Sequence, residues 1–104
     1  MEKIFTDANF AEFEAAGLPM VVDFSATWCG PCKKVGAYIE KLAEAYGDKA
    51  NIGKCDVDEN DDLTSKYGIR NVPTVLFIKN GEVVDKHVGA ATYDVLEEKL
   101  KAFL

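Results

Sequence analysis

Two cysteines separated by a glycine and a proline are the residues of this chain best suited to chemistry. The motif Cys29-Gly30-Pro31-Cys32 follows an apolar segment of strand length and precedes a long helical pattern, which places it at a helix N-terminus. Unpaired backbone N–H groups and the partial positive charge of such an end stabilise a thiolate. The sequence therefore predicts that Cys29 is an activated nucleophile and that Cys32 lies on the same side of the helix.

Two thiols placed one helical turn apart can form and break a disulfide. A mixed disulfide formed at Cys29 would be resolved by Cys32, so the predicted reaction is dithiol–disulfide exchange. A zinc site is disfavoured, because it needs about four ligands and only Cys55 and His87 remain as soft candidates. A purely structural disulfide is also disfavoured, because it closes too small a loop to restrain the unfolded chain. We therefore predict no metal ligands.

The composition restricts the classes of protein to which the chain can belong. Its 104 residues, 48% of them hydrophobic, suffice for one compact domain covering residues 1–104. A net charge of -6 disfavours nucleic acids and anionic membranes as partners. There is no apolar run of roughly 20 residues and no basic leader followed by an apolar stretch. Three cysteines are too few, and odd in number, for a disulfide-stapled secreted scaffold, which favours the cytoplasm.

The hydrophobic pattern predicts alternating strands and helices around the two cysteines. Helices are predicted at 7–16, 31–46, 61–67 and after Thr92, and strands at 20–26, 52–57, 75–78 and 83–84. Thr6 and Asp7 are candidate caps of the first helix, and Thr92 of the last. Asn80-Gly81 favours a type I′ turn, so the last two strands should be antiparallel. With a first strand that is given no range, the order β-α-β-α-β-α-β-β-α predicts an α/β fold with helices on both faces of a mixed sheet.

The strongest resemblance to a known family lies in residues 22–32, Val-Asp-Phe-Ser-Ala-Thr-Trp-Cys-Gly-Pro-Cys, which are similar to the active-site segment of the thioredoxin family. The similarity covers essentially the whole chain and includes Lys54, 67–74 (Tyr-Gly-Ile-Arg-Asn-Val-Pro-Thr), 79–82 (Lys-Asn-Gly-Glu) and 88–90 (Val-Gly-Ala). A lone C-x-x-C motif is a weak signal, whereas this combination is specific. The resemblance implies the thioredoxin fold, a central mixed five-stranded β-sheet flanked by four helices on both faces.

The resemblance also implies a function in cell redox homeostasis. The chain would be a monomeric general protein disulfide reductase in which Cys29 attacks target disulfides and Cys32 releases the reduced product. Its partners would be disulfide-containing target proteins and a thioredoxin reductase. That reductase, using NADPH and flavin, or ferredoxin in some organisms, would restore the dithiol, so the chain itself would hold no cofactor.

A docking surface around the nucleophile is implied by the same resemblance. Pro73 aligns with the family's cis-proline, which faces the active disulfide, and the backbone of Val72 would pair with an extended stretch of substrate. The flat apolar surface of the family corresponds here to Trp28, Gly30, Pro31, Val57, Val72, Pro73, Gly89 and Ala90. Trp28 would also shield the disulfide.

Asp23 and Lys54 allow two interpretations. An aspartate inside an apolar strand is unexpected, because burial opposes ionisation and raises the pKa of a carboxyl. The residues alone slightly favour a structural role, in which Asp23 caps a backbone group and Lys54 is a surface lysine. The resemblance favours a buried general base that takes the proton of Cys32 through a water, with Lys54 as its charge partner.

The remaining polar and thiol residues receive simpler interpretations. Cys55 adjoins Lys54 on a strand and therefore faces the opposite side, as a core residue, with a regulatory thiol as the alternative. His87 is expected on an exposed strand, and the acidic residues 56–62 on a solvated face. Gly36 stands within the long helix, in a region where many thioredoxins carry a kinking proline. It indicates either a soft bend or a close contact between helix and sheet.

Two rival functions remain open at this point. One is an oxidant or isomerase on the same fold, because the reduction potential depends on details that the motif only partly fixes. The Gly30-Pro31 pair resembles the reducing members. The other is a non-enzymatic role as a folded subunit, which full activity of a variant with both Cys29 and Cys32 changed to Ser would favour.

Overall fold

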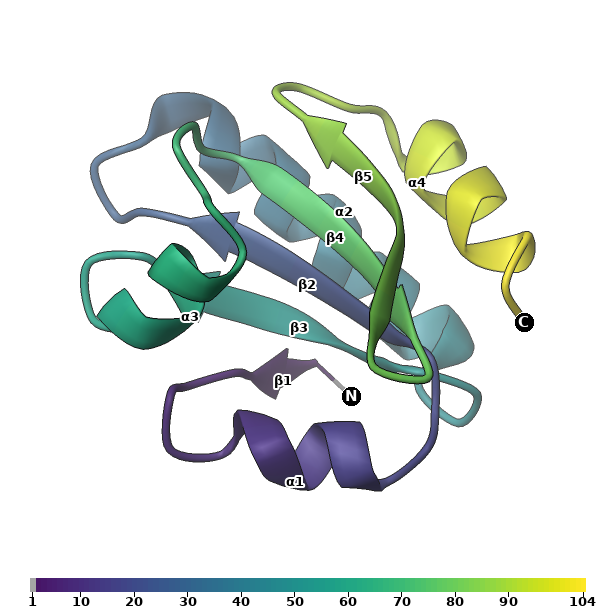
Figure 1. Cartoon of the computed structure of the whole chain (residues 1–104). Helices are drawn as coiled ribbons and strands as arrows, with labels where there is room; N and C mark the ends of the chain where they lie inside the picture. The colour runs from purple at the N-terminus through teal and green to yellow at the C-terminus, as the bar shows by residue number, and fades with distance from the viewer. Residues whose placement is uncertain (1) are drawn as a thin grey trace.

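A mixed five-stranded sheet forms the centre of the computed structural model, which describes residues 2–104 (Figure 1). Its strands are β1 (Lys3–Ile4), β2 (Met20–Ser25), β3 (Asn51–Asp56), β4 (Thr74–Lys79) and β5 (Glu82–Val88). They lie in the order β1-β3-β2-β4-β5, with β1, β3 and β2 parallel and with β4 antiparallel to both β2 and β5. The mixed sheet predicted from the sequence is confirmed.

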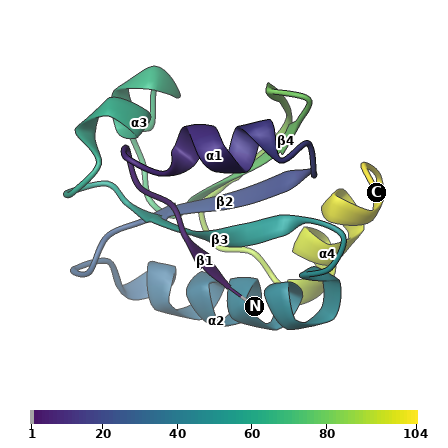
Figure 2. The ribbon, with the colours of Figure 1, turned by 90° about the horizontal axis from the view of Figure 1, so that it is seen from below.

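Helices cover both faces of this sheet. Helices α1 (Phe10–Ala15) and α3 (Asp61–Lys66) lie on one face, and α2 (Gly30–Tyr46) and α4 (Tyr93–Lys101) lie on the other (Figure 2). Successive residues of a strand point to opposite faces. Val21 accordingly packs in the cluster under α2 and α4, and Val22 in the cluster under α1 and α3. Burial on both faces explains why β2 is an almost continuous apolar run.

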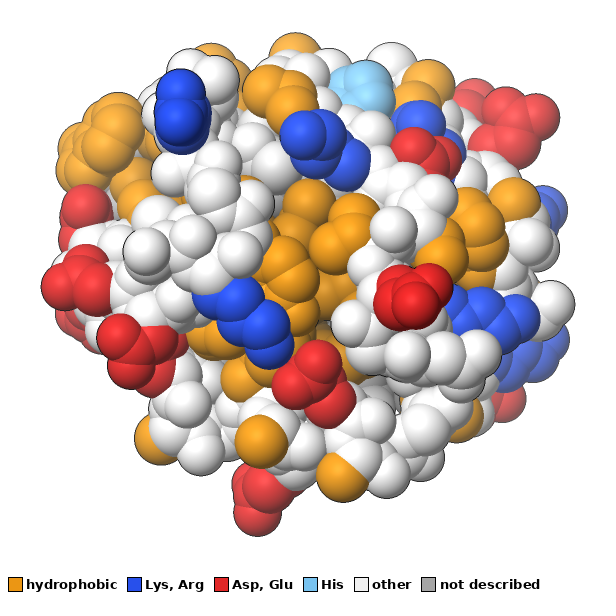
Figure 3. Space-filling view, in the orientation of Figure 1, with side chains coloured by type: hydrophobic (Ala, Val, Ile, Leu, Met, Phe, Trp, Pro, Cys, Tyr) orange, Lys and Arg blue, Asp and Glu red, His pale blue; other side chains and the backbone are white. Residues whose placement is uncertain are grey.

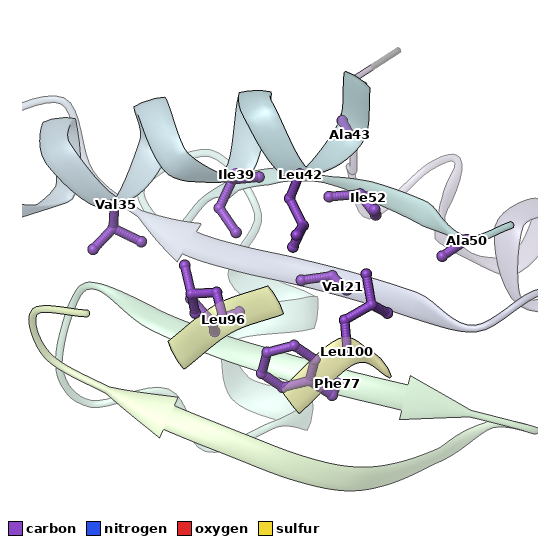
Figure 4. Close-up of a cluster of buried hydrophobic side chains, with 11 residues drawn as sticks. Val21, Val35, Ile39, Leu42, Ala43, Ala50, Ile52, Phe77, Leu96 and Leu100 are labelled. Carbon is purple, nitrogen blue, oxygen red and sulfur yellow. The ribbon is translucent and has the colours of Figure 1, made fainter. Parts of the chain in front are cut away.

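The cluster between α2, α4 and the sheet fixes the position of α2 (Figure 4). Val35, Ile39 and Leu42 recur at spacings of four and three residues, so they share one helix face and point toward β2. From α4, Leu96 and Leu100 close the same cluster. This packing anchors α2 along its length, and its N-terminus therefore carries the cysteine motif at a defined place beside the end of β2.

Two predicted local features are confirmed. Asn80 (φ 54°) and Gly81 (φ 79°) both adopt the left-handed conformation that a type I′ turn requires, and they join β4 to β5. Thr92 caps α4, because its side-chain oxygen accepts a hydrogen bond from the backbone N–H of Val95. Strand β5 is longer than the predicted 83–84. Its residues 85–88 form no apolar run because β5 is the exposed edge of the sheet.

Of the two proposed caps of the first helix, Asp7 was wrong, whereas the side-chain oxygen of Thr6 accepts a hydrogen bond from the backbone N–H of Asn9 at 3.1 Å, in the turn before the helix. Helix α1 begins at Phe10 rather than at residue 7, and its N-cap residue, Asn9, makes no capping hydrogen bond with its side chain. The carboxylate of Asp7 instead accepts hydrogen bonds from the backbone N–H groups of Asp62 (3.2 Å) and Leu63 (2.9 Å), at the start of α3. The N–H of Asp7 donates to the side chain of Asn60 at 2.9 Å. Asp7 therefore stabilises a helix far away in the sequence.

Gly53 is required where β1 meets β3. A Cβ atom at this position would overlap the backbone of Lys3, its partner in the parallel pair. We expect Gly53→Ala to displace β1 and to lower the free energy of unfolding by about 2 kcal/mol or more. Chemical denaturation measures this value. Gly30→Ala is the matched control, because its Cβ meets no atom within 4 Å. An equal loss in both variants would contradict the assignment.

Candidate active site

The cysteine motif lies at the N-terminus of α2, as predicted. Cys29 is the N-cap residue of the helix, and it forms a disulfide with Cys32 in the first turn. Both residues are largely buried, with exposed fractions of 6% and 4%. The backbone N–H of Cys32 donates to the sulfur of Cys29 at 3.2 Å. In the reduced protein this contact and the helix dipole favour a thiolate at Cys29.

A cis peptide bond between Val72 and Pro73 lies against the disulfide. The sulfur of Cys29 is 3.8 Å from the carbonyl oxygen of Val72. The backbone N–H of Gly89 donates to the carbonyl of Pro73 at 2.8 Å, which brings the end of β5 to the same place. The resemblance implied this cis-proline, and the structure confirms both the cis bond and its position beside the nucleophile.

An exposed apolar rim surrounds the disulfide. Trp28 is 71% exposed, and its indole N–H donates to the carboxylate of Asp58 at 2.8 Å. Beside it is a hollow of about 310 Å³, lined by Trp28, Val57, Thr64, Ile69, Arg70, Asn71 and Val72. Of the other residues expected on the docking surface, Gly30, Pro31 and Ala90 are exposed and Gly89 is half-buried. Pro73 is buried, so it offers a partner little area of its own.

Acidic side chains border this rim on one side. Figure 3 shows hydrophobic atoms over the loop between β2 and α2, with acidic side chains next to them over the loop between β3 and α3. Asp58, Glu59, Asp61 and Asp62 are all exposed. These four residues of the acidic run therefore lie on a solvated face, as the sequence indicated, whereas Asp56 is half-buried and lines the cavity beside Cys32.

Asp23 is a buried carboxylate without a hydrogen-bond partner. It is 0% exposed, and neither of its oxygens accepts a hydrogen bond from another protein group. The structural alternative, in which it caps a backbone group, is therefore wrong. Burial raises the pKa of Asp23 to about 7, although the charge of Lys54 lowers it and the charge of Glu2 raises it. A carboxyl with this pKa can gain and lose a proton at neutral pH.

Lys54 lies beside Asp23 but forms its ion pair with Glu2, a residue with no role predicted from the sequence. Asp23 and Lys54 are register partners in the β2–β3 pair, and they lie on the α2 side of the sheet. The ammonium of Lys54 is 3.8 Å from a carboxylate oxygen of Glu2. Glu2 directly precedes β1, and the pairing of β1 with β3 carries it to Lys54. The sequence offered no signal for Glu2, because this pairing joins distant segments.

Gly36 makes room for Lys54 under α2. A Cβ atom at Gly36 would come within 3.2 Å of both the terminal carbon and the nitrogen of the Lys54 side chain. Helix α2 continues without interruption from Gly30 to Tyr46. Of the two interpretations of Gly36, the close contact between helix and sheet is therefore confirmed.

A solvent-accessible cavity joins Lys54 to the resolving cysteine. It has a volume of about 390 Å³ and is lined by Ile4, Ser25, Ala26, Thr27, Cys32, Lys33, Lys54 and Asp56. Its lining is largely apolar but includes the polar side chains of Ser25, Lys54 and Asp56, so a space of this size can hold water molecules bound to these groups. Water can therefore reach both Cys32 and the ammonium beside Asp23.

Cys55 and His87 lie away from the reacting sulfurs. Cys55 is 0% exposed in the cluster under α1 and α3, so it faces away from Lys54 as predicted. Burial and the nearby charges of Asp7 and Asp56 raise the pKa of its thiol to about 12. His87 is half-buried in β5, where its ring nitrogen lies 2.8 Å from the carbonyl oxygen of Ala90.

We expect the thiol of Cys55 to be unreactive in the folded protein. In the oxidised form Cys29 and Cys32 are joined, which leaves Cys55 as the free thiol. A thiol reagent should therefore modify none of the folded, oxidised protein within minutes, and one thiol per chain after addition of guanidinium. Rapid modification without denaturant would instead support the regulatory role.

Two further features concern residues 2–104 as a whole. No group of three or more His, Cys, Asp or Glu side chains in this range is arranged to bind a metal ion. Among the helices of the same range, none combines the length and the apolar character needed to span a membrane.

The fold and the site together define a class of protein. A redox-active cysteine pair at a helix N-terminus, facing a cis-proline on a mixed sheet, is the arrangement of a thiol–disulfide oxidoreductase. Comparison with known proteins agrees. The family model described as thioredoxin matches residues 2–102. The chain therefore belongs to the thioredoxin family, whose members are protein disulfide oxidoreductases.

Individual relatives show how far the similarity extends. The chain is 49% identical to thioredoxin 2 of Chlorobaculum tepidum over 91% of its own length and 88% of that protein. It is 47% identical to a thioredoxin of Chlorobaculum thiosulfatiphilum over 91% and 89% of the two lengths. With the thioredoxin of Bacillus subtilis it shares 41% identity, over 95% and 94%. The match thus covers nearly the full length of each protein.

Proposed function

We propose that this chain reduces disulfides in other proteins, with Cys29 as nucleophile and Cys32 as resolving thiol. The observation that carries the proposal is the position of the pair, with Cys29 as N-cap of α2 and the N–H of Cys32 directed at its sulfur. This arrangement stabilises a thiolate at the more N-terminal sulfur. The exposed rim around it offers a target protein an apolar surface centred on Trp28.

The reaction proceeds in two exchanges. The thiolate of Cys29 attacks one sulfur of the target disulfide, which breaks that bond and releases the other sulfur as a thiolate. The thiol of Cys32 then loses its proton and attacks the sulfur of Cys29. This second step forms the Cys29–Cys32 disulfide and releases the second target sulfur. Two electrons pass from the chain to the target, which leaves as a dithiol once its thiolates are protonated.

Asp23 is the proposed acceptor of the Cys32 proton. It is buried and unpartnered, and its pKa of about 7 matches the pH at which the thiol must be deprotonated. The cavity lined by Cys32 and Lys54 provides room for a water that relays the proton. Lys54 supplies a positive charge beside the ionised carboxylate of Asp23 before that group accepts the proton.

We further propose that a thioredoxin reductase, carrying NADPH and flavin or using ferredoxin, returns the oxidised pair to the dithiol. The chain itself would bind no cofactor and would act as a monomer in the cytoplasm. The thioredoxin relatives support the reductase and the target class. The odd number of cysteines and the single exchangeable pair support a reducing compartment.

The reduction potential of the Cys29–Cys32 pair tests this function. It can be followed by the fluorescence of Trp28, which is the single tryptophan of the chain and directly precedes Cys29, in dithiothreitol or glutathione buffers. We expect a value near about -270 mV, as for reducing members of the family. A value above about -200 mV would indicate an oxidant or isomerase and would overturn the proposal.

A further inference from the structure

The charge of Lys54 acts on two carboxylates, those of Asp23 and Glu2. The first is Asp23, its register partner on β2, which is fully buried and accepts no hydrogen bond. The second is Glu2, whose carboxylate oxygen lies 3.8 Å from the Lys54 nitrogen. The Glu2 side chain is only 19% exposed, so this ion pair is screened less than a surface pair.

The space around the Lys54 side chain is narrow, which restricts the position of its ammonium group. Gly36 of α2 leaves so little room that even a methyl group would contact the end of the Lys54 side chain at 3.2 Å. The side chain therefore lies against the helix rather than free in solvent. Its charge acts on the carboxylates of Asp23 and Glu2, which face it from β2 and from the segment before β1.

We propose that Glu2 is a positioning residue of the reaction: it binds the ammonium of Lys54 and so withholds part of that cation's charge from Asp23. This inference rests on the proposed role of Asp23 as the base for Cys32. A cation paired fully with Asp23 would stabilise the ionised carboxylate and make it a weaker base. A cation shared with Glu2 leaves Asp23 able to accept a proton near neutral pH, and the negative charge of Glu2 acts in the same direction.

Within residues 2–104, further charged groups near this cluster belong to β3 and α2. Asp56 of β3 and Lys33 of α2 line the cavity that Lys54 also lines. Glu40 of α2 adds negative charge near Glu2 and, with burial, raises the pKa of the Glu2 carboxyl. The Cys29–Cys32 pair does not titrate while it is oxidised. The oxidised protein therefore isolates the titration of the carboxyl groups from that of the thiols.

A titration of the Asp23 carboxyl carbon by NMR, in the oxidised protein, tests the proposal. Glu2→Gln removes the negative charge and keeps the size of the side chain. We expect the midpoint of the Asp23 titration to fall by about half a pH unit or more in this variant, because the positive charge of Lys54 then acts on Asp23 alone. The acidic limb of the pH profile of protein disulfide reduction should move in the same direction. Glu2→Asp keeps the negative charge, so in this variant the midpoint of the Asp23 titration should lie closer to that of the parent.

Glu14→Gln is the matched control. Glu14 also forms an ion pair with a lysine, Lys66, at 3.9 Å, but it belongs to α1 on the opposite face of the sheet. We expect this variant to leave the Asp23 midpoint unchanged. A midpoint that is equal in Glu2→Gln and in the parent, or that rises, overturns the proposal. Neither result depends on whether the chain reduces proteins, which the reduction potential tests separately.

Discussion

A Cys32→Ser variant should accumulate target proteins as mixed disulfides on Cys29. The first exchange needs only the thiolate of Cys29, which the N-terminus of α2 stabilises. The second exchange needs a thiol at position 32, and the hydroxyl of serine cannot replace it as a nucleophile towards sulfur. The covalent complexes should be visible on non-reducing gels after incubation with an oxidised protein substrate, and dithiothreitol should release them.

The complementary variant gives the control for this experiment. Cys29→Ser should form no such complexes and should lose catalysed reduction by at least about a thousandfold, because the attacking sulfur is absent. Cys32 lies inside the first turn of α2, where its backbone N–H stabilises the sulfur of Cys29, and is the less suited to attack an incoming disulfide. Abundant complexes in Cys29→Ser, with none in Cys32→Ser, would reverse the assigned roles of the two cysteines.

Replacement of Asp23 by asparagine should stabilise the protein and slow its reaction. The ordinary pKa of an aspartate is 3.8, whereas burial raises the pKa of Asp23 to about 7 in the folded state. A difference of about 3 pH units corresponds to about 4 kcal/mol between the two protonation states. At pH 8 the ionised Asp23 therefore destabilises the fold by this order of magnitude, and Asp23→Asn removes the destabilisation.

The pH dependence of this gain has a definite sign. Below pH 4 the carboxyl is protonated in both the folded and the unfolded chain, and the two proteins should differ little in stability. Between pH 4 and 7 the unfolded chain releases its proton first, so the parent loses stability as the pH rises. Above pH 7 the full difference remains. Urea denaturation of both proteins between pH 4 and pH 8 measures it.

A control at an exposed position separates this effect from a general change of charge. The same exchange at the exposed Asp48 should leave the free energy of unfolding within about 0.5 kcal/mol of the parent at every pH.

Asp23→Asn should also reduce target disulfides more slowly at neutral pH, because the proton of Cys32 loses its acceptor. A rate equal to that of the parent across the pH range would contradict the role of Asp23 as a base.

Much of the fold could be predicted because its signals are local. The strand at Met20–Ser25 is an apolar run, and helix α2 repeats its apolar residues at helical spacing. The turn at Asn80-Gly81 is specified by two adjacent residues. The cysteine motif was equally local, and its position at a helix N-terminus follows from the elements on either side.

The parts of the site that could not be predicted depend on contacts between distant segments. Glu2 reaches Lys54 only because β1 pairs with β3, and no spacing in the sequence indicates this register. Asp7 resembles the cap of the helix that follows it, yet its carboxylate binds the start of α3. The hydrogen bond between Trp28 and Asp58 likewise joins two loops. Tertiary packing decides each of these three contacts, and local preference does not.

The hydrogen bonds between Asp7 and α3 determine which segments of the molecule unfold together. Helix α3 has six residues, too few to be stable alone, and two of its first N–H groups are bonded to a residue more than fifty positions earlier. The N-terminal segment and α3 therefore form one cooperative unit, and their amide hydrogens should exchange with solvent at similar rates. Truncation of the first nine residues would release α3 as well, and with it one border of the surface around Trp28.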